Sequence, residues 1–408
     1  MDLLYNFGIR TYKAAVRLAS CKNRKARLML QGQSQTFDKL REKLDPQQEY
    51  IWIHSSSLGE FEQARPLIES IKEKKPDARI VLSFFSPSGY EVRKNYSMAE
   101  AVCYLPFDLI GNVKKFLDIV HPSMAIFVKY EFWGNYLMEL RRRKIPTYII
   151  SAIFRENQIF FKPWGGMFRK MLRCFDTLFV QDEKSKQMLA GIGINNVVVA
   201  GDTRFDRVAT VRDAAREFPI IGQMVKDAPF TLVMGSSWEP DEDIVIPYFN
   251  SHPEMKLILA PHEFDKQRLL ELMGRIKRKT VLYSLAHTSN LDNVDCLIID
   301  SFGLLSSLYR YGQAAYVGGG FGSGIHNINE AAVYGIPVIF GPRYQKFREA
   351  CDLVAREGAF SITNAEDFAS HMDRLLTDAD HLHHTGEIAA NYIKENLGAT
   401  QRIYDRIF

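Results

Sequence analysis

The sequence predicts an α/β fold made of two Rossmann-like domains that face each other across a cleft. Short apolar segments alternate with helical patterns along most of the 408 residues, and the charged, strandless stretch 203–227 interrupts this alternation once. Strands that alternate with helices build βαβ units around a parallel sheet. Open sheets of this kind bind ligands where their strands end, so two similar halves predict a cleft between two sets of carboxyl-terminal strand ends.

The strand candidates are short apolar runs with turn residues or helical patterns between them. The first series contains Tyr50–Ile53, Arg79–Ser83, Ala101–Tyr104, Ser123–Val128, Thr147–Ser151, Thr177–Val180 and Asn196–Ala200. The second series contains Phe230–Met234, Met255–Leu259, Thr280–Tyr283, Cys296–Ile299, Ala314–Val317 and Pro337–Phe340. Apolar residues at three- and four-residue spacing predict helices such as Glu60–Lys72, Phe132–Arg143, Phe347–Arg356 and Ile388–Glu395.

Composition limits the class of protein. A chain of this length can form about two domains, each with its own core. Its five cysteines are scattered and none forms a CxxC pair, which indicates a reducing compartment and argues against a disulfide framework or a zinc site. The pattern GxxxxGK[ST] is absent, so hydrolysis of ATP or GTP through a P-loop is not expected.

The N-terminal segment is basic and amphipathic. Residues 1–30 carry seven Lys and Arg against one Asp, although the whole chain has a net charge of only +4. This local basicity argues against a general nucleic-acid-binding surface. Leu3, Leu4 and Phe7 are interleaved with the cations, but no run reaches the ~18 apolar residues that span a bilayer. Two interpretations stay open: contact with an anionic membrane leaflet, or a helix packed on its own domain.

The segment Tyr316–Glu349 is the most informative part of the chain. A predicted strand runs into five glycines within Gly318–Gly324, and a helix that carries Asn327 and Glu330 should follow. Glycine lets backbone approach a ligand, and a helix N-terminus offers free N–H groups to phosphate. A carboxylate on the first turn can accept hydrogen bonds from a ribose diol. This order of elements predicts a nucleotide-sugar site and hence a glycosyltransferase.

Two carboxylates in the first half are candidates for acid–base chemistry. Glu60 ends the run His54-Ser-Ser-Ser-Leu-Gly-Glu60 after a predicted strand, where it could deprotonate an attacking hydroxyl. Alternatively, it only complements a helix dipole. Glu131 follows another predicted strand and stands beside aromatics that could pack on a sugar. Alternatively, it is a helix N-terminal acid next to two core aromatics.

The second half offers small and polar residues after its predicted strands. Gly235-Ser236-Ser237 could bind an anion through backbone N–H groups. His262 follows the next strand, and Gly303 and Leu304 follow a later one. Asp241 and Asp243 have the DxD spacing of some metal-dependent transferases, but an acidic helix start explains them better.

Together these motifs resemble the 3-deoxy-D-manno-octulosonic acid (Kdo) transferases of lipopolysaccharide assembly, roughly from Trp52 to Arg348. The matching pieces are SSSLGE (55–60), SPSGY (86–90), LPFD (105–108), KYEFWGN (129–135), VQDEKS (180–185), GDTRFD (201–206), GSSWEPDE (235–242), DSFGLL (300–305) and VGGGFGSGIHNINEAA (317–332). The last piece, continued by GIPVIFGP (335–342), is the most specific.

The resemblance implies a GT-B architecture and an inverting, metal-independent transfer of Kdo from CMP-Kdo to the primary hydroxyl of a lipid A precursor. It implies that Glu60 is the general base, that Glu131 is a second catalytic carboxylate in the acceptor cleft, and that CMP leaves. No cofactor is implied. The implied substrate- and donor-binding residues are Ser57, Gly59, Gly235, Ser236, Ser237, His262, Gly303, Leu304, Gly320, Ser323, Gly324, His326, Asn327 and Glu330, with Glu330 at the ribose. Many members have Pro-Arg-His where this chain has Ala260-Pro261-His262, so an arginine expected near the donor phosphate is missing.

The expected organisation follows from both lines of argument. Residues 1–30 form a membrane-associating segment, 31–210 an acceptor-binding domain, 211–390 a domain that binds CMP-Kdo, and 391–408 a helix that crosses back to the first domain. The expected location is peripheral, on the cytoplasmic face of the bacterial inner membrane. Two alternatives remain: another GT-B nucleotide-sugar enzyme, either a different transferase or a 2-epimerase, or a non-catalytic nucleotide-sugar-binding protein.

Overall fold

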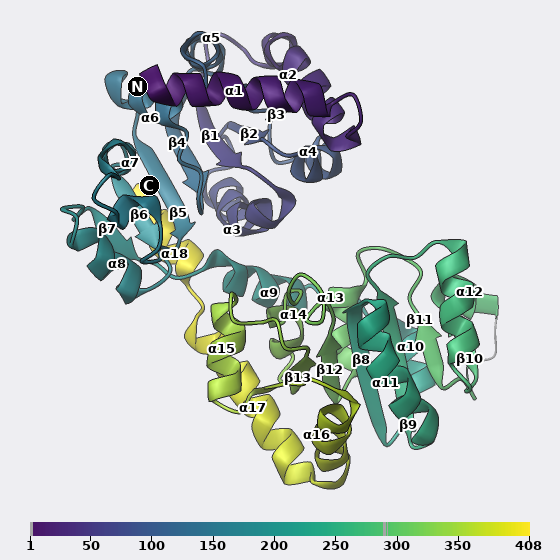
Figure 1. The fold of residues 1–408 in the computed structure, drawn as a ribbon. Helices are drawn as coiled ribbons and strands as arrows, with labels where there is room; N and C mark the ends of the chain where they lie inside the picture. The colour runs from purple at the N-terminus through teal and green to yellow at the C-terminus, as the bar shows by residue number, and fades with distance from the viewer. Residues whose placement is uncertain (1–2, 289–290, 292) are drawn as a thin grey trace. The chain divides into compact units, whose positions relative to one another are not determined.

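The computed structural model describes residues 3–288, 291 and 293–408. The chain divides into two compact units (Figure 1): the first unit is Met1–Arg207 with Leu397–Phe408, and the second unit is Val208–Asn396. The boundaries expected from the sequence are 210 and 390. Each unit holds a seven-stranded sheet whose paired strands are parallel, so the predicted α/β class with two Rossmann-like domains is confirmed.

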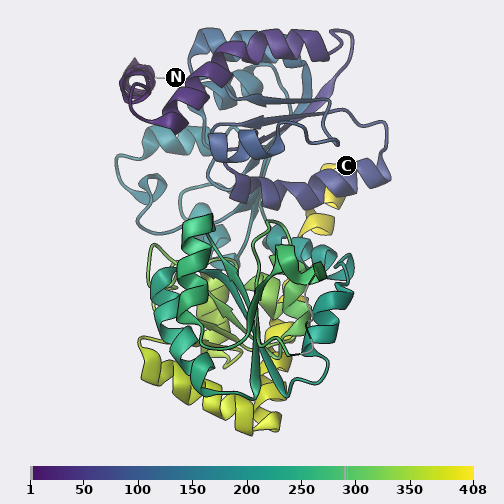
Figure 2. The ribbon, with the colours of Figure 1, turned by 90° about the vertical axis from the view of Figure 1, so that its right-hand side faces the viewer.

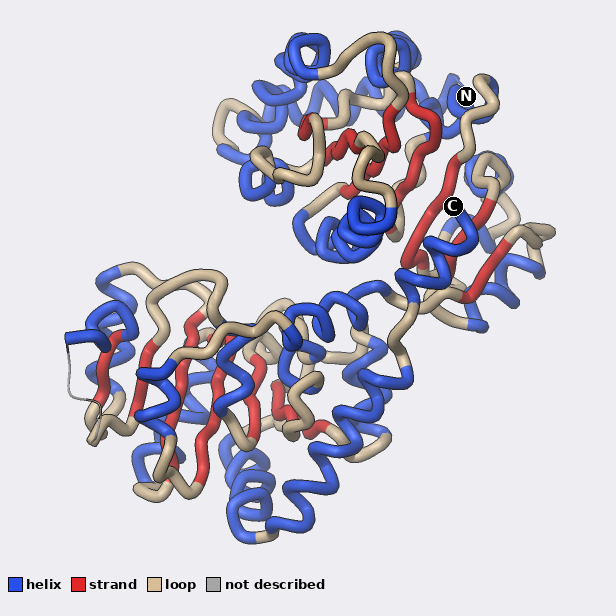
Figure 3. The backbone as a smooth tube through the Cα atoms, turned by 180° about the vertical axis from the view of Figure 1, so that it is seen from behind, coloured by secondary structure: helices blue, strands red, loops and turns tan. Residues whose placement is uncertain are grey.

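The sheet of the first unit has the order β3-β2-β1-β4-β5-β6-β7. Its strands are β1 (Tyr50–Ser55), β2 (Ile80–Phe84), β3 (Ala101–Tyr104), β4 (Pro122–Val128), β5 (Thr147–Ala152), β6 (Thr177–Val180) and β7 (Val197–Val199). Trp52 and Ile53 are neighbours on β1, so their side chains point to opposite faces, yet both are fully buried. Figure 3 shows the reason, because helices lie on both sides of the strands.

The helices of the first unit include its N-terminal segment, the crossover connections between its strands, and the last residues of the chain. They are α1 (Leu3–Ala19), α2 (Arg24–Lys43), α3 (Leu58–Lys74), α4 (Pro87–Arg93), α5 (Ile110–Val120), α6 (Gly134–Arg142), η1 (Ile159–Phe161), α7 (Gly166–Leu172), α8 (Glu183–Ala190) and α18 (Ala399–Ile407). Helix α9 (Thr203–Asp213) begins in the first unit and ends in the second. Ile403 of α18 is fully buried in a core cluster of the first unit.

The sheet of the second unit has the order β10-β11-β9-β8-β12-β13-β14. Its strands are β8 (Phe230–Ser237), β9 (Met255–Pro261), β10 (Thr280–Leu282), β11 (Cys296–Ile298), β12 (Ala314–Val317), β13 (Val338–Phe340) and β14 (Ala359–Ser361). Its remaining helices are α10 (Pro219–Val225), α11 (Glu239–Ser251), α12 (Lys266–Arg275), η2 (Tyr283–Thr288), α13 (Leu305–Leu308), η3 (Tyr309–Tyr311), α14 (Asn329–Ala332), α15 (Arg348–Ala355), α16 (Ala365–Thr377) and α17 (Ala379–Glu395). The edge strand β14 has only three residues, and the sequence analysis does not identify it.

Each sheet has one point at which the strand order reverses. In the first unit β1 has β2 on one side and β4 on the other, and in the second unit β8 lies between β9 and β12. Loops that leave the carboxyl ends of such neighbouring strands turn to opposite faces, and the crevice between them is the usual ligand site of an open α/β sheet. The β1–α3 and β4–α6 loops, and the β8–α11 and β12–α14 loops, are therefore the places to look for a site.

Helix α1 lies crosswise to α2, as Figure 2 shows by looking along α1. One face of α1 packs on the first unit: the Tyr5 hydroxyl donates to Asp108 Oδ2 at 2.5 Å, and the Tyr12 ring lies 6.0 Å from that of Phe107. The other face is exposed, and it carries Leu3, Leu4, Phe7 and Leu18. None of the helices in the described part of the chain is long and apolar enough to cross a membrane.

Candidate active site

Glu60 sits on the first turn of α3, beyond the end of β1, as predicted. Its Oε2 accepts the backbone N–H of Ser57 at 3.1 Å, so the carboxylate does cap the helix. Burial raises the pKa of Glu60 to about 7, and the charge of Glu131 adds to this rise, whereas the N–H groups of Ser56 and Ser57 and the Lys129 ammonium oppose it. A carboxylate with a pKa near neutrality is suited to accept a proton in a reaction at neutral pH.

Glu131 lies beyond the end of β4, next to the point where the strand order of the first sheet reverses. Lys129 has a φ of 63°, in the left-handed region that non-glycine residues rarely adopt, and the chain turns there. The buried Glu131 carboxylate lies 3.0 Å from His54 Nε2 and accepts the indole N–H of Trp133 at 2.6 Å. Backbone and side chain together hold this carboxylate in one place.

The aromatic residues beside Glu131 belong to the protein interior. The Phe132 ring packs 4.8 Å from Phe160, and the Trp133 ring packs 4.6 Å from Phe85. These contacts fit the alternative with two core aromatics, although Phe132 and Trp133 are only partly buried. Glu131 itself is no helix acid, because α6 begins three residues later, at Gly134, and has no acidic residue in its first turn.

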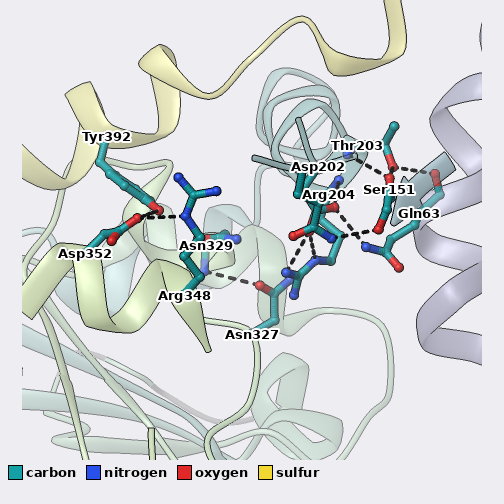
Figure 4. A network of polar contacts seen from close by, with 11 residues as sticks. Gln63, Ser151, Asp202, Thr203, Arg204, Asn327, Asn329, Arg348, Asp352 and Tyr392 are labelled. Atoms are coloured by element: carbon teal, nitrogen blue, oxygen red, sulfur yellow. Dashed lines mark hydrogen bonds and ion pairs between the residues drawn. The ribbon is translucent and has the colours of Figure 1, made fainter. Parts of the chain in front are cut away.

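A polar cluster around Asp202 joins three segments of the first unit (Figure 4). Asp202 is buried; it accepts the Gln63 amide at 3.0 Å and pairs with the Arg204 guanidinium at 2.8 Å. The Ser151 and Thr203 hydroxyls lie 3.0 Å apart, and Thr203 also donates to the Gln63 carbonyl at 2.6 Å. Burial disfavours the charged form of Asp202, but Arg204 holds the pKa of its carboxyl below the usual value. The cluster fixes α3, and thus the helix that carries Glu60, against β5 and the start of α9.

In the second unit, the predicted residues at the end of β8 are tightly packed. A Cβ on Gly235 would lie 2.1 Å from the Tyr309 hydroxyl, so no larger residue fits there. Ser236 has a φ of 53°. The Ser237 hydroxyl donates to Glu242 Oε1 at 2.9 Å, and Arg268 pairs with the other oxygen of Glu242.

Asp241 joins the β8–α11 turn to the glycine loop. Its carboxylate accepts the backbone N–H groups of Trp238 and Gly319, each at 3.0 Å, and the Tyr316 hydroxyl at 2.9 Å. Asp243 is exposed and pairs with Arg275 instead. The two carboxylates of the DxD spacing thus have different structural partners, in agreement with an acidic helix start.

The glycine loop leads into a helix much shorter than predicted. Helix α14 has only four residues, so Glu330 lies on it, but Asn327 precedes it; the prediction of one helix carrying both is wrong. Gly335, with a φ of 72°, ends this segment before β13. The Asn327 amide still reaches Glu330 Oε1 at 3.1 Å. A Cβ on Gly320 would lie 2.6 Å from the backbone of Gly341, which explains the glycine there.

Three rings gather at the carboxyl edge of the second sheet. His262 stacks on Trp238 with centroids 4.5 Å apart, and His326 lies 4.5 Å from His262. The Trp238 indole N–H donates to His326 Nε2 at 3.3 Å. Burial, with the neighbouring His262, lowers the pKa of His326 to about 4, so this imidazole is neutral at neutral pH.

The structure brings the predicted residues together within each unit. Ser57, Gly59, Glu60 and Glu131 surround the end of β1 and β4, and the remaining predicted residues lie at or beyond the ends of β8, β9, β11 and β12. Ser323 and Gly303 are exposed in their loops. The sequence indicates no role for His54 or Trp238, although the motifs HSSSLGE and GSSWEPDE contain them.

Polar side chains also tie α15 to α17 in the second unit (Figure 4). The Tyr392 hydroxyl donates to Asp352 Oδ2 at 2.9 Å, and the Arg348 Nε atom lies 3.4 Å from the same oxygen. On the glycine-loop side of Figure 4, the backbone N–H of Asn329 donates to Asn327 Oδ1 at 3.3 Å. This contact fixes the Asn327 amide at the start of α14.

Solved structures define the class of protein. The UDP-GlcNAc 2-epimerase of Neisseria meningitidis, bound to UDP-GlcNAc, superimposes with a TM-score of 0.61, covering 88% of this chain and 99% of that one at 15% identity. The S. aureus MnaA–UDP structure gives a TM-score of 0.59, with 88% and 96% coverage at 16% identity. The chain, with its two sheets of parallel strands, thus has the GT-B fold.

Sequence comparison then shows which known proteins the chain resembles. The model of the family described as 3-Deoxy-D-manno-octulosonic-acid transferase (kdotransferase) matches residues 23–207. The 3-deoxy-D-manno-octulosonic acid transferase of Aquifex aeolicus is 27% identical over 335 residues, which cover 80% of this chain and 86% of the relative. The Haemophilus influenzae transferase is 24% identical over 373 residues, with 88% and 87% coverage. These matches confirm the resemblance to Kdo transferases along most of the chain and support a glycosyltransferase.

Proposed function

We propose that this protein transfers Kdo from CMP-Kdo to the primary hydroxyl of a lipid A precursor, with inversion at the anomeric carbon. The observation that carries the proposal is Glu60, a largely buried carboxylate whose pKa is raised to about 7, in a chain that resembles Kdo transferases. Near neutral pH a substantial fraction of Glu60 is ionised and able to take a proton.

The reaction balances with Glu60 as the general base. The acceptor oxygen forms a bond to the anomeric carbon of Kdo while its proton passes to Glu60. The bond from that carbon to the phosphate oxygen of CMP breaks, and CMP leaves with the electron pair. Attack from the face opposite to the leaving group inverts the configuration. Glu131 would contribute negative charge next to Glu60 and a polar surface for the acceptor.

The second unit supplies the residues proposed for the donor. An anionic nucleotide favours a loop whose glycines let the backbone approach the ligand, and the β12–α14 loop contains five glycines. Glu330, held by the Asn327 amide, is the group proposed for the ribose diol. The neutral His326, with His262 and Trp238, offers flat surfaces beside that loop.

The exposed face of α1 supports membrane contact. Leu3 is 91% exposed and Phe7 68% exposed, and basic residues such as Arg10 and Arg17 stand on the same helix. An exposed apolar row with interspersed cations is suited to the surface of an anionic leaflet. Tyr5 and Tyr12 pack on the first unit, which supports the packed-helix interpretation for one face of α1, and the membrane interpretation is proposed for the other face. We propose a peripheral location on the cytoplasmic face of the inner membrane.

A second exposed aromatic supports the same location. Trp164 is 72% exposed at the tip of the loop between η1 and α7. The Arg169 guanidinium holds this loop by donating to the carbonyls of Phe160 and Lys162, both at 2.9 Å. An exposed tryptophan two residues after Lys162 in such a loop is typical of an interface with lipid headgroups.

The deciding experiment follows CMP release from CMP-Kdo with and without a lipid A precursor, with the lipid monitored by mass. We expect CMP release coupled to the addition of Kdo-sized units to the lipid. Glu60→Gln should lower turnover by ~10²-fold or more and leave the affinity for CMP unchanged, because only the proton acceptor is lost. Glu73→Gln, an exposed residue on the same helix, is the matched control.

Two outcomes would contradict the proposal. A folded protein that releases no CMP in the presence of the lipid acts on a different nucleotide sugar, as another GT-B transferase or a 2-epimerase would. Near wild-type turnover of Glu60→Gln would remove Glu60 as the base while leaving the resemblance to Kdo transferases intact.

A further inference from the structure

Helix α6 begins directly after the turn that carries Glu131, and a carboxylate from another loop caps it. The N-cap residue of α6 is Trp133, and an indole cannot accept a backbone N–H as a Ser or Asp side chain would. Asp108 takes this place from the loop between β3 and α5. It is fully buried and accepts the backbone N–H of Asn135 at 2.9 Å and that of Tyr136 at 3.0 Å. The start of α6 therefore depends on partners outside the helix.

Helix α1 supplies the rest of this cap. Gly134, the first residue of α6, donates its backbone N–H to the Tyr5 hydroxyl at 2.9 Å, and that hydroxyl donates its own hydrogen to Asp108 Oδ2 at 2.5 Å. The next residue of α1, Asn6, accepts the side-chain amide of Asn135 at 2.9 Å. Gly134 is buried, so water cannot easily replace the Tyr5 hydroxyl as the acceptor of its N–H.

The capped helix start holds the Glu131 carboxylate through Trp133. The Trp133 carbonyl accepts the backbone N–H of Leu137 at 2.9 Å, within the first turn of α6. The Trp133 indole N–H donates to Glu131 Oε2 at 2.6 Å. Backbone and side chain of one residue thus connect the start of α6 to the carboxylate. If the first turn of α6 frays, Trp133 gains freedom and Glu131 loses its fixed orientation.

We propose that Tyr5 is a positioning residue for the candidate active site of the first unit, because its hydroxyl completes the cap of α6 and so holds the turn that carries Glu131. Helix α1 then has two roles, one on each face. Its exposed residues offer a surface to the membrane, and its packed face completes the site. The effect on turnover rests on the proposed function, in which Glu131 contributes to the transfer site.

Hydrogen exchange of the full-length protein, followed by mass spectrometry, tests the cap without any substrate. Tyr5→Phe removes only the hydroxyl and keeps the ring. We expect amide exchange in the segment 130–137 to become about tenfold faster, because the Gly134 N–H and Asp108 each lose a partner. Tyr12→Phe removes a hydroxyl from the same helix and should leave this exchange at the wild-type rate.

Two exchange results would overturn the proposal. Unchanged exchange of the segment 130–137 in Tyr5→Phe would show that the hydroxyl does not hold the start of α6. Equally faster exchange throughout the first unit would show a general loss of stability instead of a local cap.

Steady-state kinetics tests the consequence for turnover. The acceptor is dispersed in detergent, so that binding to a bilayer does not limit the reaction. Tyr5→Phe should lower kcat about tenfold and leave KM for CMP-Kdo unchanged, because the residues proposed for the donor belong to the other unit. Tyr12→Phe should turn over like the wild type.

The two measurements separate this proposal from the proposed function. If Tyr5 only attached α1 for membrane binding, cosedimentation with vesicles would fall while kcat in detergent stayed unchanged, and that result would overturn the positioning role. Faster exchange of the segment 130–137 in a protein that transfers no Kdo would support the cap and contradict the proposed function alone.

Discussion

At the scale of the residue, Glu60 shows why a motif alone could not separate two roles. The spacing places it on the first turn of α3, where it accepts the Ser57 N–H at 3.1 Å, as a helix-capping acid does. What also suits it to be a base is burial and the charge of Glu131, which β4 brings from a distant part of the chain. No local pattern contains that information. The same holds for His54, whose buried partners come from β2 and from the β4–α6 turn.

The raised pKa of Glu60 predicts how Glu60→Gln changes stability with pH. The pKa lies near 4.5 in an unfolded chain and at about 7 in the folded one, so the native protein loses stability as the pH rises from about 4.5 to about 7. Glutamine does not titrate, so the variant does not lose stability over this pH range. Glu60→Gln should therefore be more stable than the wild type by roughly 1–3 kcal/mol above pH 7, and the difference should shrink toward pH 4.5.

Urea denaturation over a pH series measures this difference, with Glu73→Gln as the control. A stability difference that stays constant over the whole pH range would show that the folded protein does not raise the pKa of Glu60.

At the scale of the element, strong apolar patterns predicted the strands well, whereas short or polar elements were not predicted well. Both sheets contain the predicted strands, because buried parallel strands are continuous apolar runs. The polar stretch 31–48 is largely part of α2, which buries only a narrow stripe that includes Met29 and Leu40. Helix α14 is short because Gly335 and Pro337 follow soon after Glu330. Such elements depend on tertiary packing more than on local preference.

The two faces of α1 predict opposite effects of substitution. Changing Leu4 and Phe7 to glutamate removes apolar area and adds negative charge on the exposed face only. Binding to vesicles that contain phosphatidylglycerol should fall at least tenfold, with unchanged thermal stability. Cosedimentation with such vesicles measures the affinity. Val92→Glu, at an exposed position on α4, is the control, and binding that survives the double substitution would contradict the role of α1.

At the scale of the whole molecule, the sequence predicted two Rossmann-like domains, because the strandless stretch 203–227 divides two similar series. The structure divides the chain at Arg207, within α9, and returns residues 397–408 to the first unit. The candidate carboxylates belong to the first unit and the proposed donor residues to the second. Sequence alone could assign residues to halves, but it could not show which polar groups already have partners inside each half, as Ser237 and Asp241 do.

This division predicts which substitutions change nucleotide affinity. Glu330→Gln should weaken CMP binding about tenfold, because a charged acceptor of hydrogen bonds from the ribose becomes neutral. Calorimetric titration with CMP measures the change, and Glu366→Gln on α16, an exposed position in the same unit, should bind like the wild type. An unchanged affinity of Glu330→Gln would refute its role at the ribose.

The return of the last residues to the first unit has a consequence for biosynthesis. Gly398 and Thr400 donate backbone N–H groups to Asp206, both at 2.6 Å, and Ile403 fills a space in the core beside α3. A ribosome delivers these residues only after the whole of Val208–Asn396 has emerged. The first unit therefore stays incomplete while the second unit is translated. A nascent chain stalled before residue 397 would expose an apolar groove that chaperones and proteases can recognise.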